Sequence, residues 1–119
     1  MKAGHVYKYY VHTNRPSYNE AVSSLAFEWD PGKNRANRKK HRVSFEEART
    51  VFFDEGALVA SDPDHSDLED RFLIIGFSLQ LRVLLVCFCE RQGGSVIRII
   101  SARKATKKEQ LQYRKGTLL

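Results

Sequence analysis

The chain has 119 residues, a net charge of +6 and an apolar fraction of 42%, which fits one globular domain and excludes a disordered chain. It has no run of roughly 18 apolar residues and no secretory signal, so we expect a soluble, cytoplasmic protein without a membrane partner. The positive charge favours an anionic partner, nucleic acid first, although many basic proteins bind none.

The first part of the chain differs in composition from the rest. Residues 1–24 combine several tyrosines with Gly, Pro, Asn and Ser, and we interpret them as an N-terminal extension with a short strand at 6–11. A single domain is expected over 25–119. It opens with a short alternating strand at 27–29.

A basic helix is predicted next, over about 31–41. Asp30 is a suitable N-cap and Pro31 suits the first helical turn. Its one apolar residue is Ala36, whereas a helix of a globular protein usually has an apolar stripe. The helix is therefore either a solvated surface or a surface for a polyanion.

A second helix follows at a capping box formed by Ser44 and Glu47. Apolar residues recur after it at helical spacing, which indicates a structural helix with core residues at its end. A short strand is predicted at 57–60 and an acidic, turn-rich loop at 61–70.

Three strands are predicted at 71–77, 81–90 and 95–103, joined by connections of hairpin length. The middle one is apolar on both faces and should be central in the sheet. Thr106 and Glu109 form a second capping box, so a last helix should run to about 115. The order predicts an α+β domain with a mostly antiparallel sheet.

Cysteine and acidic residues give no metal or redox motif. Cys87 and Cys89 lie on one face of a strand and are expected to be buried, unpaired core residues. The acidic segment 62–67 lacks the Gly and Glu positions of a calcium loop and is interpreted as a solvated turn. We therefore expect neither a metal nor a cofactor.

Arginines on or beside apolar strands are the first candidate site residues. Arg is rarely buried unless it is paired, and a single Arg at a strand end is commonly just solvated. Four in consecutive strands favour a shared face, because neighbouring strands lie about 4.8 Å apart and Arg binds phosphate bidentately. They are Arg71, Arg82, Arg98 and Arg103.

The basic helix supplies the second group. Lys33, Asn37, Lys40 and His41 have the spacings of one helix face. Such a face suits phosphate binding and acid–base chemistry. The alternative is structural, with His41 interacting with the negative end of the helix dipole.

The order of motifs resembles the BrnT toxins of bacterial type II toxin–antitoxin systems over about residues 26–115. The motifs are Phe27-Glu28-Trp29-Asp30-Pro31-x-Lys33-Asn34-x-x-Asn37-x-x-Lys40-His41, Val43-x-Phe45-x-x-Ala48, Glu69-x-Arg71-Phe72-x-x-x-Gly76, Arg82-Val83, Ile97-Arg98-Ile99-Ile100-Ser101-Ala102-Arg103-x-Ala105-x-x-x-Glu109, and Tyr113. In one departure, Arg42 stands where the family usually has Gly after the Lys-His pair.

The resemblance implies a RelE-like fold, with N-terminal helices and a C-terminal helix packed on a mostly antiparallel sheet of four to five strands. It implies a metal-independent endoribonuclease that cleaves RNA and inhibits translation. It also implies a BrnA-like antitoxin with a ribbon-helix-helix domain, through which the complex would bind operator DNA.

The resemblance and the chemistry of RNA cleavage together suggest roles for individual residues. The expected catalytic residues are His41, Lys40, Arg71, Arg82 and Arg103. The expected RNA-binding residues are Lys33, Asn37, Arg98 and Tyr113. Trp29 is expected to be in the core rather than stacked on a base. Two alternatives stay open: a non-catalytic module that binds nucleic acid or protein through a basic face, and a small structural domain.

Overall fold

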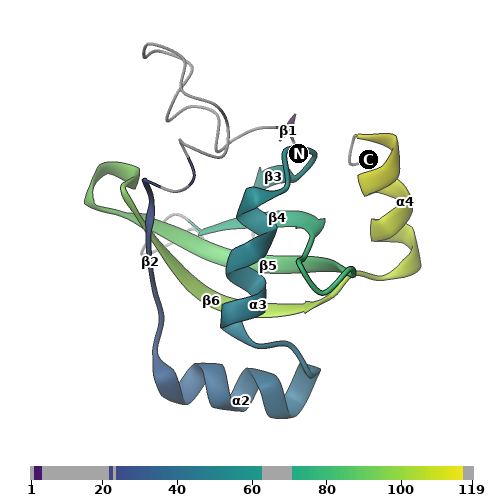
Figure 1. The fold of residues 1–119 in the computed structure, drawn as a ribbon. Coiled ribbons are helices and arrows are strands. Elements are labelled where there is room, and N and C mark those ends of the chain that lie inside the picture. Colours follow the sequence, from purple (N-terminus) through teal and green to yellow (C-terminus); the bar gives the residue numbers. More distant parts are fainter. Residues whose placement is uncertain (1, 4–21, 23, 63–70, 117–119) are drawn as a thin grey trace.

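In a computed structural model, residues 2–3, 22, 24–62 and 71–116 are described. They form a six-stranded sheet in the order β1-β3-β4-β5-β6-β2 (Figure 1). The strands are β1 (Lys2–Ala3), β2 (Ala26–Glu28), β3 (Leu58–Ser61), β4 (Arg71–Phe77), β5 (Val83–Arg91) and β6 (Val96–Lys104). The helices are α2 (Pro31–His41), α3 (Phe45–Thr50), α4 (Lys107–Lys115) and the short 3-10 turns η2 (Val51–Phe53) and η4 (Gln92–Gly94).

The α+β, RelE-like fold class predicted from the sequence is confirmed. All strand pairs are antiparallel except β2 with β6. β5 lies between β4 and β6, as its apolar composition on both faces predicts. The sheet has six strands rather than four to five, because the two-residue strand β1 adds to the edge of β3.

Side-chain caps fix where the helices begin. The Asp30 carboxylate accepts from two N–H groups of the first turn of α2, and Ser44 accepts from the backbone N–H of Glu47 at 3.0 Å. At α4 both bonds of the capping box between Thr106 and Glu109 are present. In α3 the Glu47 carboxylate bonds instead to Arg82, which immediately precedes β5, so only the Ser44 half of that prediction holds.

The large core lies between one face of the sheet and α3 with η2. Alternate residues of β4 and β5 point into it, and aromatic rings fill its centre, with Phe52 and Phe88 edge to face at 5.0 Å between centroids. Trp29 is partly buried and packs edge to face on Phe45 at 6.1 Å between centroids, so it lies against the core as expected. We call this face of the sheet the core face.

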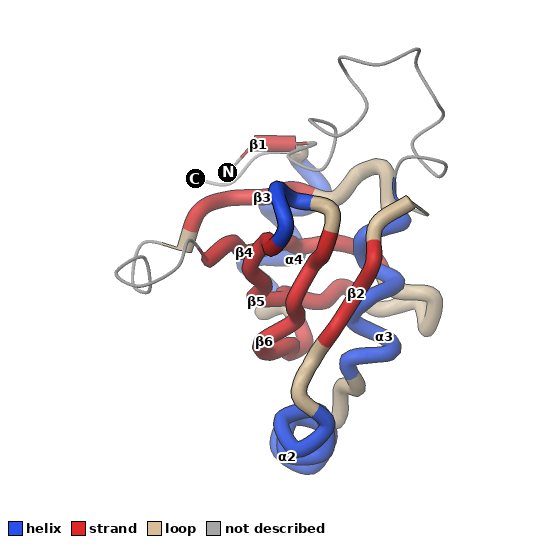
Figure 2. Tube along the Cα trace, turned by 90° about the vertical axis from the view of Figure 1, so that its left-hand side faces the viewer, coloured by secondary structure: helices blue, strands red, loops and turns tan. Residues whose placement is uncertain are grey.

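The opposite face of the sheet is only partly covered. At one end Leu58, Ile75 and Ala105 are buried, and Tyr113 of α4 packs against them. Figure 2 shows α4 behind the sheet and α2 below it. The rest of this face, which we call the pocket face, carries the site described below.

The segment expected to be an extension contributes to the fold. Val22 is fully buried in the large core, and Lys2 pairs with Val59 in the sheet. The strand predicted at 6–11 lies outside the described residues. In the part of the chain that the structure describes, no helix is both long and apolar enough to cross a membrane.

Candidate active site

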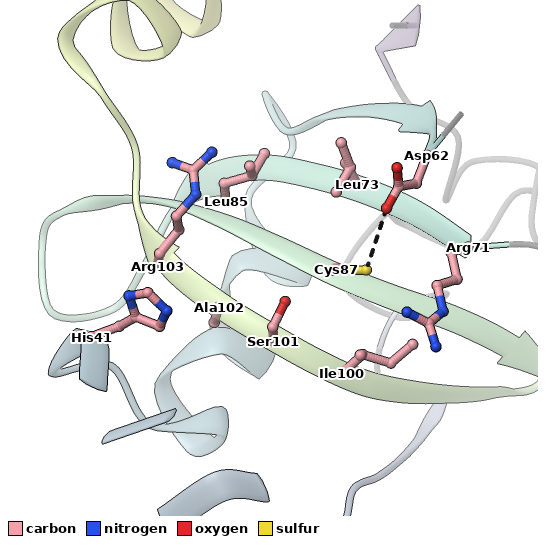
Figure 3. A pocket seen from close by; sticks show the side chains of 10 residues that line it. All are labelled: His41, Asp62, Arg71, Leu73, Leu85, Cys87, Ile100, Ser101, Ala102 and Arg103. Carbon is pink, nitrogen blue, oxygen red and sulfur yellow. Dashed lines mark hydrogen bonds between the residues drawn. The ribbon is translucent and has the colours of Figure 1, made fainter. Parts of the chain in front are cut away.

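A pocket of about 420 Å³ opens on the pocket face beside the end of α2. Its volume is within the range of about 300–1,000 Å³ that is usual for small-molecule sites. Its lining residues come from α2, from the end of β3 and from β4, β5 and β6 (Figure 3). They are His41, Asp62, Arg71, Leu73, Leu85, Cys87, Ile100, Ser101, Ala102 and Arg103.

Three of the residues predicted as catalytic meet in this pocket. They are His41, Arg71 and Arg103, which lie on α2, β4 and β6. Figure 3 shows His41 and Arg103 at one end and Arg71 with Asp62 at the other. The imidazole and guanidinium at one end can bind a phosphodiester and exchange a proton with it, and the second guanidinium can bind another part of the same nucleotide.

Strand register explains why these side chains share a face. Leu73 of β4 lies opposite Cys87 of β5, which lies opposite Ser101 of β6, and side chains two residues apart point the same way. The register between β5 and β6 shifts after Cys87. This irregularity inserts an extra residue on β6, so Ile100 also lines the pocket.

Asn37 fixes α2 beside β6 and so sets the position of His41. Its amide donates to the Ala102 carbonyl at 2.8 Å and accepts from the Ala102 N–H at 3.1 Å, as a neighbouring strand would. It also donates to the Val43 carbonyl at 2.8 Å. Because His41 lies one helical turn further on, these bonds hold its imidazole over the pocket.

Asn34 ties the same helix to α3. Its side-chain oxygen accepts from the Phe45 N–H at 2.9 Å, and its amide donates to Glu46 at 2.8 Å. Asn34 and Asn37 are the buried residues of α2. The helix is therefore docked by amides rather than by an apolar stripe.

The expected face of four functional residues on α2 needs correction. Asn37 is 7% exposed and committed to the backbone of the fold, whereas Lys33 and Lys40 are exposed. His41 is half-buried at the pocket. The buried asparagines of α2 thus dock the helix on the fold, and the basic side chains of its last turn face the solvent.

Arg103 is held at the pocket by α4. Its guanidinium makes two bonds to the Glu109 carboxylate, at 2.9 and 3.0 Å. The same ion pair lowers the pKa of Glu109 and raises that of Arg103. Glu109 also forms part of the capping box of α4. The same carboxylate therefore stabilises the first turn of α4 and holds the Arg103 side chain in position.

Arg82 does not gather with the pocket arginines. Its guanidinium forms a bidentate pair with Glu47, at 2.8 and 2.6 Å, and donates to the Arg42 carbonyl at 2.8 Å. Glu47 is 4% exposed and also accepts from Ser78 at 2.7 Å. These bonds lower the pKa of Glu47, and they join α3 to the start of β5 on the core face.

Arg98 and Tyr113 likewise make contacts within the fold. Arg98 pairs with Glu28 of β2 at 2.8 Å. The Tyr113 hydroxyl donates to the Asp54 carboxylate, whose oxygens also accept from two backbone N–H groups, so Tyr113 anchors α4. Burial and this hydrogen bond raise the pKa of Tyr113. Of the four arginines singled out in the sequence, the pocket brings together Arg71 and Arg103.

Asp62 and Cys87 line the pocket, although neither is among the site residues predicted from the sequence. Asp62 is 8% exposed, so it is not part of a solvated turn as expected. The Cys87 thiol donates to its carboxylate at 3.9 Å, and burial raises the pKa of Cys87 to about 11. Cys87 could have been predicted as a pocket residue from the alternation of side chains along the strands, which puts it on the same face of the sheet as Arg71 and Arg103. Cys87 and Cys89 are buried and form no disulfide bond with each other, as predicted.

No metal centre accompanies the pocket in the described part of the chain. There, no group of three or more His, Cys, Asp or Glu side chains lies close enough to hold an ion. The positive charge near His41 comes from the exposed last turn of α2, with Arg38, Lys39 and Lys40. Such a surface suits a polyanion.

Comparisons with known proteins give a family match and a structural match. A family model described as "Ribonuclease toxin, BrnT, of type II toxin-antitoxin system" matches residues 29–109. The crystal structure of the Brucella abortus ribonuclease toxin, BrnT, has a similar fold, with a TM-score of 0.51 and 24% sequence identity. The similarity covers 70% of this chain and 99% of that one. No curated protein matches the chain.

Proposed function

The chain belongs to the BrnT family of ribonuclease toxins of type II toxin–antitoxin systems, and we propose that the pocket beside α2 is where it cleaves RNA. The observation that supports this assignment is that His41, Arg71 and Arg103 line one pocket. They come from an 11-residue helix and two strands that are far apart in the sequence.

The proposed reaction needs no metal. The ribose 2′-oxygen attacks the adjacent phosphorus after losing its proton, and the bond to the 5′-oxygen breaks as that oxygen gains a proton. His41 is the group that takes or gives one of these protons, because imidazole can do either near neutral pH. Arg103, at the His41 end of the pocket, stabilises the charge that builds on the phosphate oxygens, and Arg71, at the other end, contacts the nucleotide beside the cleaved bond.

The exposed lysines bind the RNA backbone in this proposal. Lys40 adjoins His41, and Lys33 lies about two helical turns away on the same helix. Both side chains are exposed and suit phosphates on either side of the cleaved bond. Arg82, Arg98, Asn37 and Tyr113 act through the fold rather than on RNA, because their polar groups bond within the protein.

A ribonuclease toxin of a type II system has an RNA substrate and a protein antitoxin. We propose further that the antitoxin is BrnA-like, with a ribbon-helix-helix domain through which the complex binds operator DNA. Cleavage of cellular RNA in the cytoplasm would inhibit translation. The net charge of +6 supports association with RNA and with an acidic segment of an antitoxin.

The decisive experiment is turnover with a chelator present. Limiting protein in EDTA should cut an excess of labelled single-stranded RNA into discrete fragments that carry 2′,3′-cyclic phosphate ends. A His41→Ala protein purified in parallel controls for contaminating nuclease. Salt-dependent RNA binding without cutting would contradict the proposal and favour a binding module.

A further inference from the structure

The two ends of the pocket differ in charge. At one end, His41 and Arg103 lie beside the basic last turn of α2. At the other, the buried carboxylate of Asp62 lies beside Arg71 (Figure 3). A phosphate next to a carboxylate in a partly buried site is strongly repelled. A phosphate therefore belongs at the His41 end, and a different part of the nucleotide must occupy the Asp62 end.

Asp62 and Arg71 form a fixed pair of an acceptor and a donor. The Asp62 N–H donates to the Arg71 carbonyl at 2.8 Å, so the two residues are direct neighbours on adjacent strands. Both side chains line the pocket. The Cys87 thiol, a weak donor, approaches the carboxylate from the next strand at 3.9 Å.

Apolar side chains separate the two ends. Leu73, Leu85 and Ile100 are half-buried and line the pocket between the charged groups. A flat aromatic ring can lie against such side chains with its polar edge toward Asp62 and Arg71. Proteins read unpaired RNA bases in this way, by contact with the ring face and hydrogen bonds to its edge.

We propose that the Asp62 end of the pocket is a nucleobase subsite that selects guanine beside the cleaved phosphate; the inference rests on the proposed function. Guanine presents N1–H and N2–H donors to a carboxylate and has O6 and N7 acceptors for a guanidinium. Adenine offers an unprotonated N1 to the carboxylate, and uracil has a single ring N–H donor between two carbonyls. Adenine and cytosine offer the carboxylate one amino group each, whereas guanine offers it two adjacent donors and keeps two acceptors for the guanidinium.

Inosine tests the subsite, because it differs from guanosine only by lacking the N2 amino group. The substrates are short uridine-rich RNAs with one guanosine or one inosine, and the readout is the cleavage position and kcat/KM. Wild-type protein should cut beside guanosine and should cut the inosine RNA roughly tenfold more slowly, the loss expected for one hydrogen bond to a charged group. In Asp62→Ala and in the isosteric Asp62→Asn, the ratio of kcat/KM for the guanosine RNA to kcat/KM for the inosine RNA should fall toward one.

The control variant is Glu55→Ala, which removes one exposed negative charge away from the pocket lining and should keep the guanosine-to-inosine ratio. Equal wild-type rates on the two RNAs would overturn the subsite while leaving the nuclease intact. So would a guanosine preference that survives in both Asp62 variants. Failure to cut any RNA would overturn the proposed function itself.

Discussion

Arginine serves different purposes on the two faces of the sheet. On the core face, Arg82 pairs with Glu47, whose side chain is only 2% exposed. On the pocket face, Arg103 pairs with Glu109, and the two side chains are 39% and 24% exposed. The two ion pairs differ in how deeply the carboxylate is buried. The buried Glu47 makes its pair with Arg82 important for stability, whereas the more exposed pair of Arg103 with Glu109 leaves the Arg103 guanidinium at the edge of the pocket. Substitutions on the two faces should therefore have different effects, the core face on stability and the pocket face on activity.

The largest expected effect is on activity. His41→Ala should lower kcat/KM for RNA by roughly a thousandfold, because it removes a proton-transfer group from the pocket. The free energy of unfolding should change little, since His41 is only half-buried. Initial rates and urea denaturation measure the two effects. Lys108→Ala on the exposed part of α4 is the control, and a folded His41→Ala protein with near wild-type rates would exclude this site.

Arg82→Ala should show the opposite pattern. It leaves the Glu47 carboxylate buried without its main partner, which should lower the free energy of unfolding by roughly 3 kcal/mol. The kcat of the molecules that remain folded should stay near wild type. Arg98→Ala is the matched control, because its partly exposed pair with Glu28 is worth only about 0.5 kcal/mol. If the two variants lose the same free energy of unfolding, burial of the carboxylate does not decide how much an ion pair contributes to stability.

Asn37→Ala should affect both properties at once. It leaves the Ala102 and Val43 backbone groups without their amide partner and should cost about 2 kcal/mol of stability. It also frees the end of α2 that carries His41, so kcat should fall more than KM rises. Arg38→Ala, an exposed neighbour on the same helix, should not lower stability. Unchanged kcat in folded Asn37→Ala would mean that these bonds do not position the imidazole.

Acid should weaken the core face through Glu47. The Arg82 guanidinium holds the pKa of Glu47 below its usual value of 4.5, so this carboxylate stabilises the fold above that pH. Its contribution is lost as the pH falls through the lowered pKa in the folded state. The stability difference between wild type and Glu47→Gln should thus be largest near neutral pH and shrink between about pH 5 and pH 3. A difference independent of pH would show that charge is not involved.

The sequence predicted the strands and the helix ends well, because both depend on local patterns. The bounds of β4 are those expected from its apolar alternation, and the Thr106 capping box places the start of α4. The docking of α2 was not predictable in this way. Asn34 and Asn37 replace an apolar stripe, and the partners of Asn37 include Ala102, which is 65 residues away.

The candidate site was predictable only in part for the same reason. His41, Arg71 and Arg103 could be proposed from residue type, but Arg82 looks identical to them in sequence. Only the folded chain shows that Glu47, 35 residues away, takes up its guanidinium. The acidic composition around Asp62 predicts a solvated loop, and its burial follows only from contacts with β4 and Cys87 in the folded chain.

The smallest effect expected is a gain in stability at Arg42, where the resemblance to BrnT toxins predicts glycine. Arg42 ends α2 in the left-handed region, with φ 60° and ψ 30°, and its N–H donates to the Arg38 carbonyl. A residue with a Cβ is strained there, so Arg42→Gly should raise the free energy of unfolding by about 1 kcal/mol. The backbone carbonyl that accepts from Arg82 is kept. Arg42→Ala removes the same charge without relieving the backbone, so an equal gain in that variant would assign the effect to charge rather than to conformation.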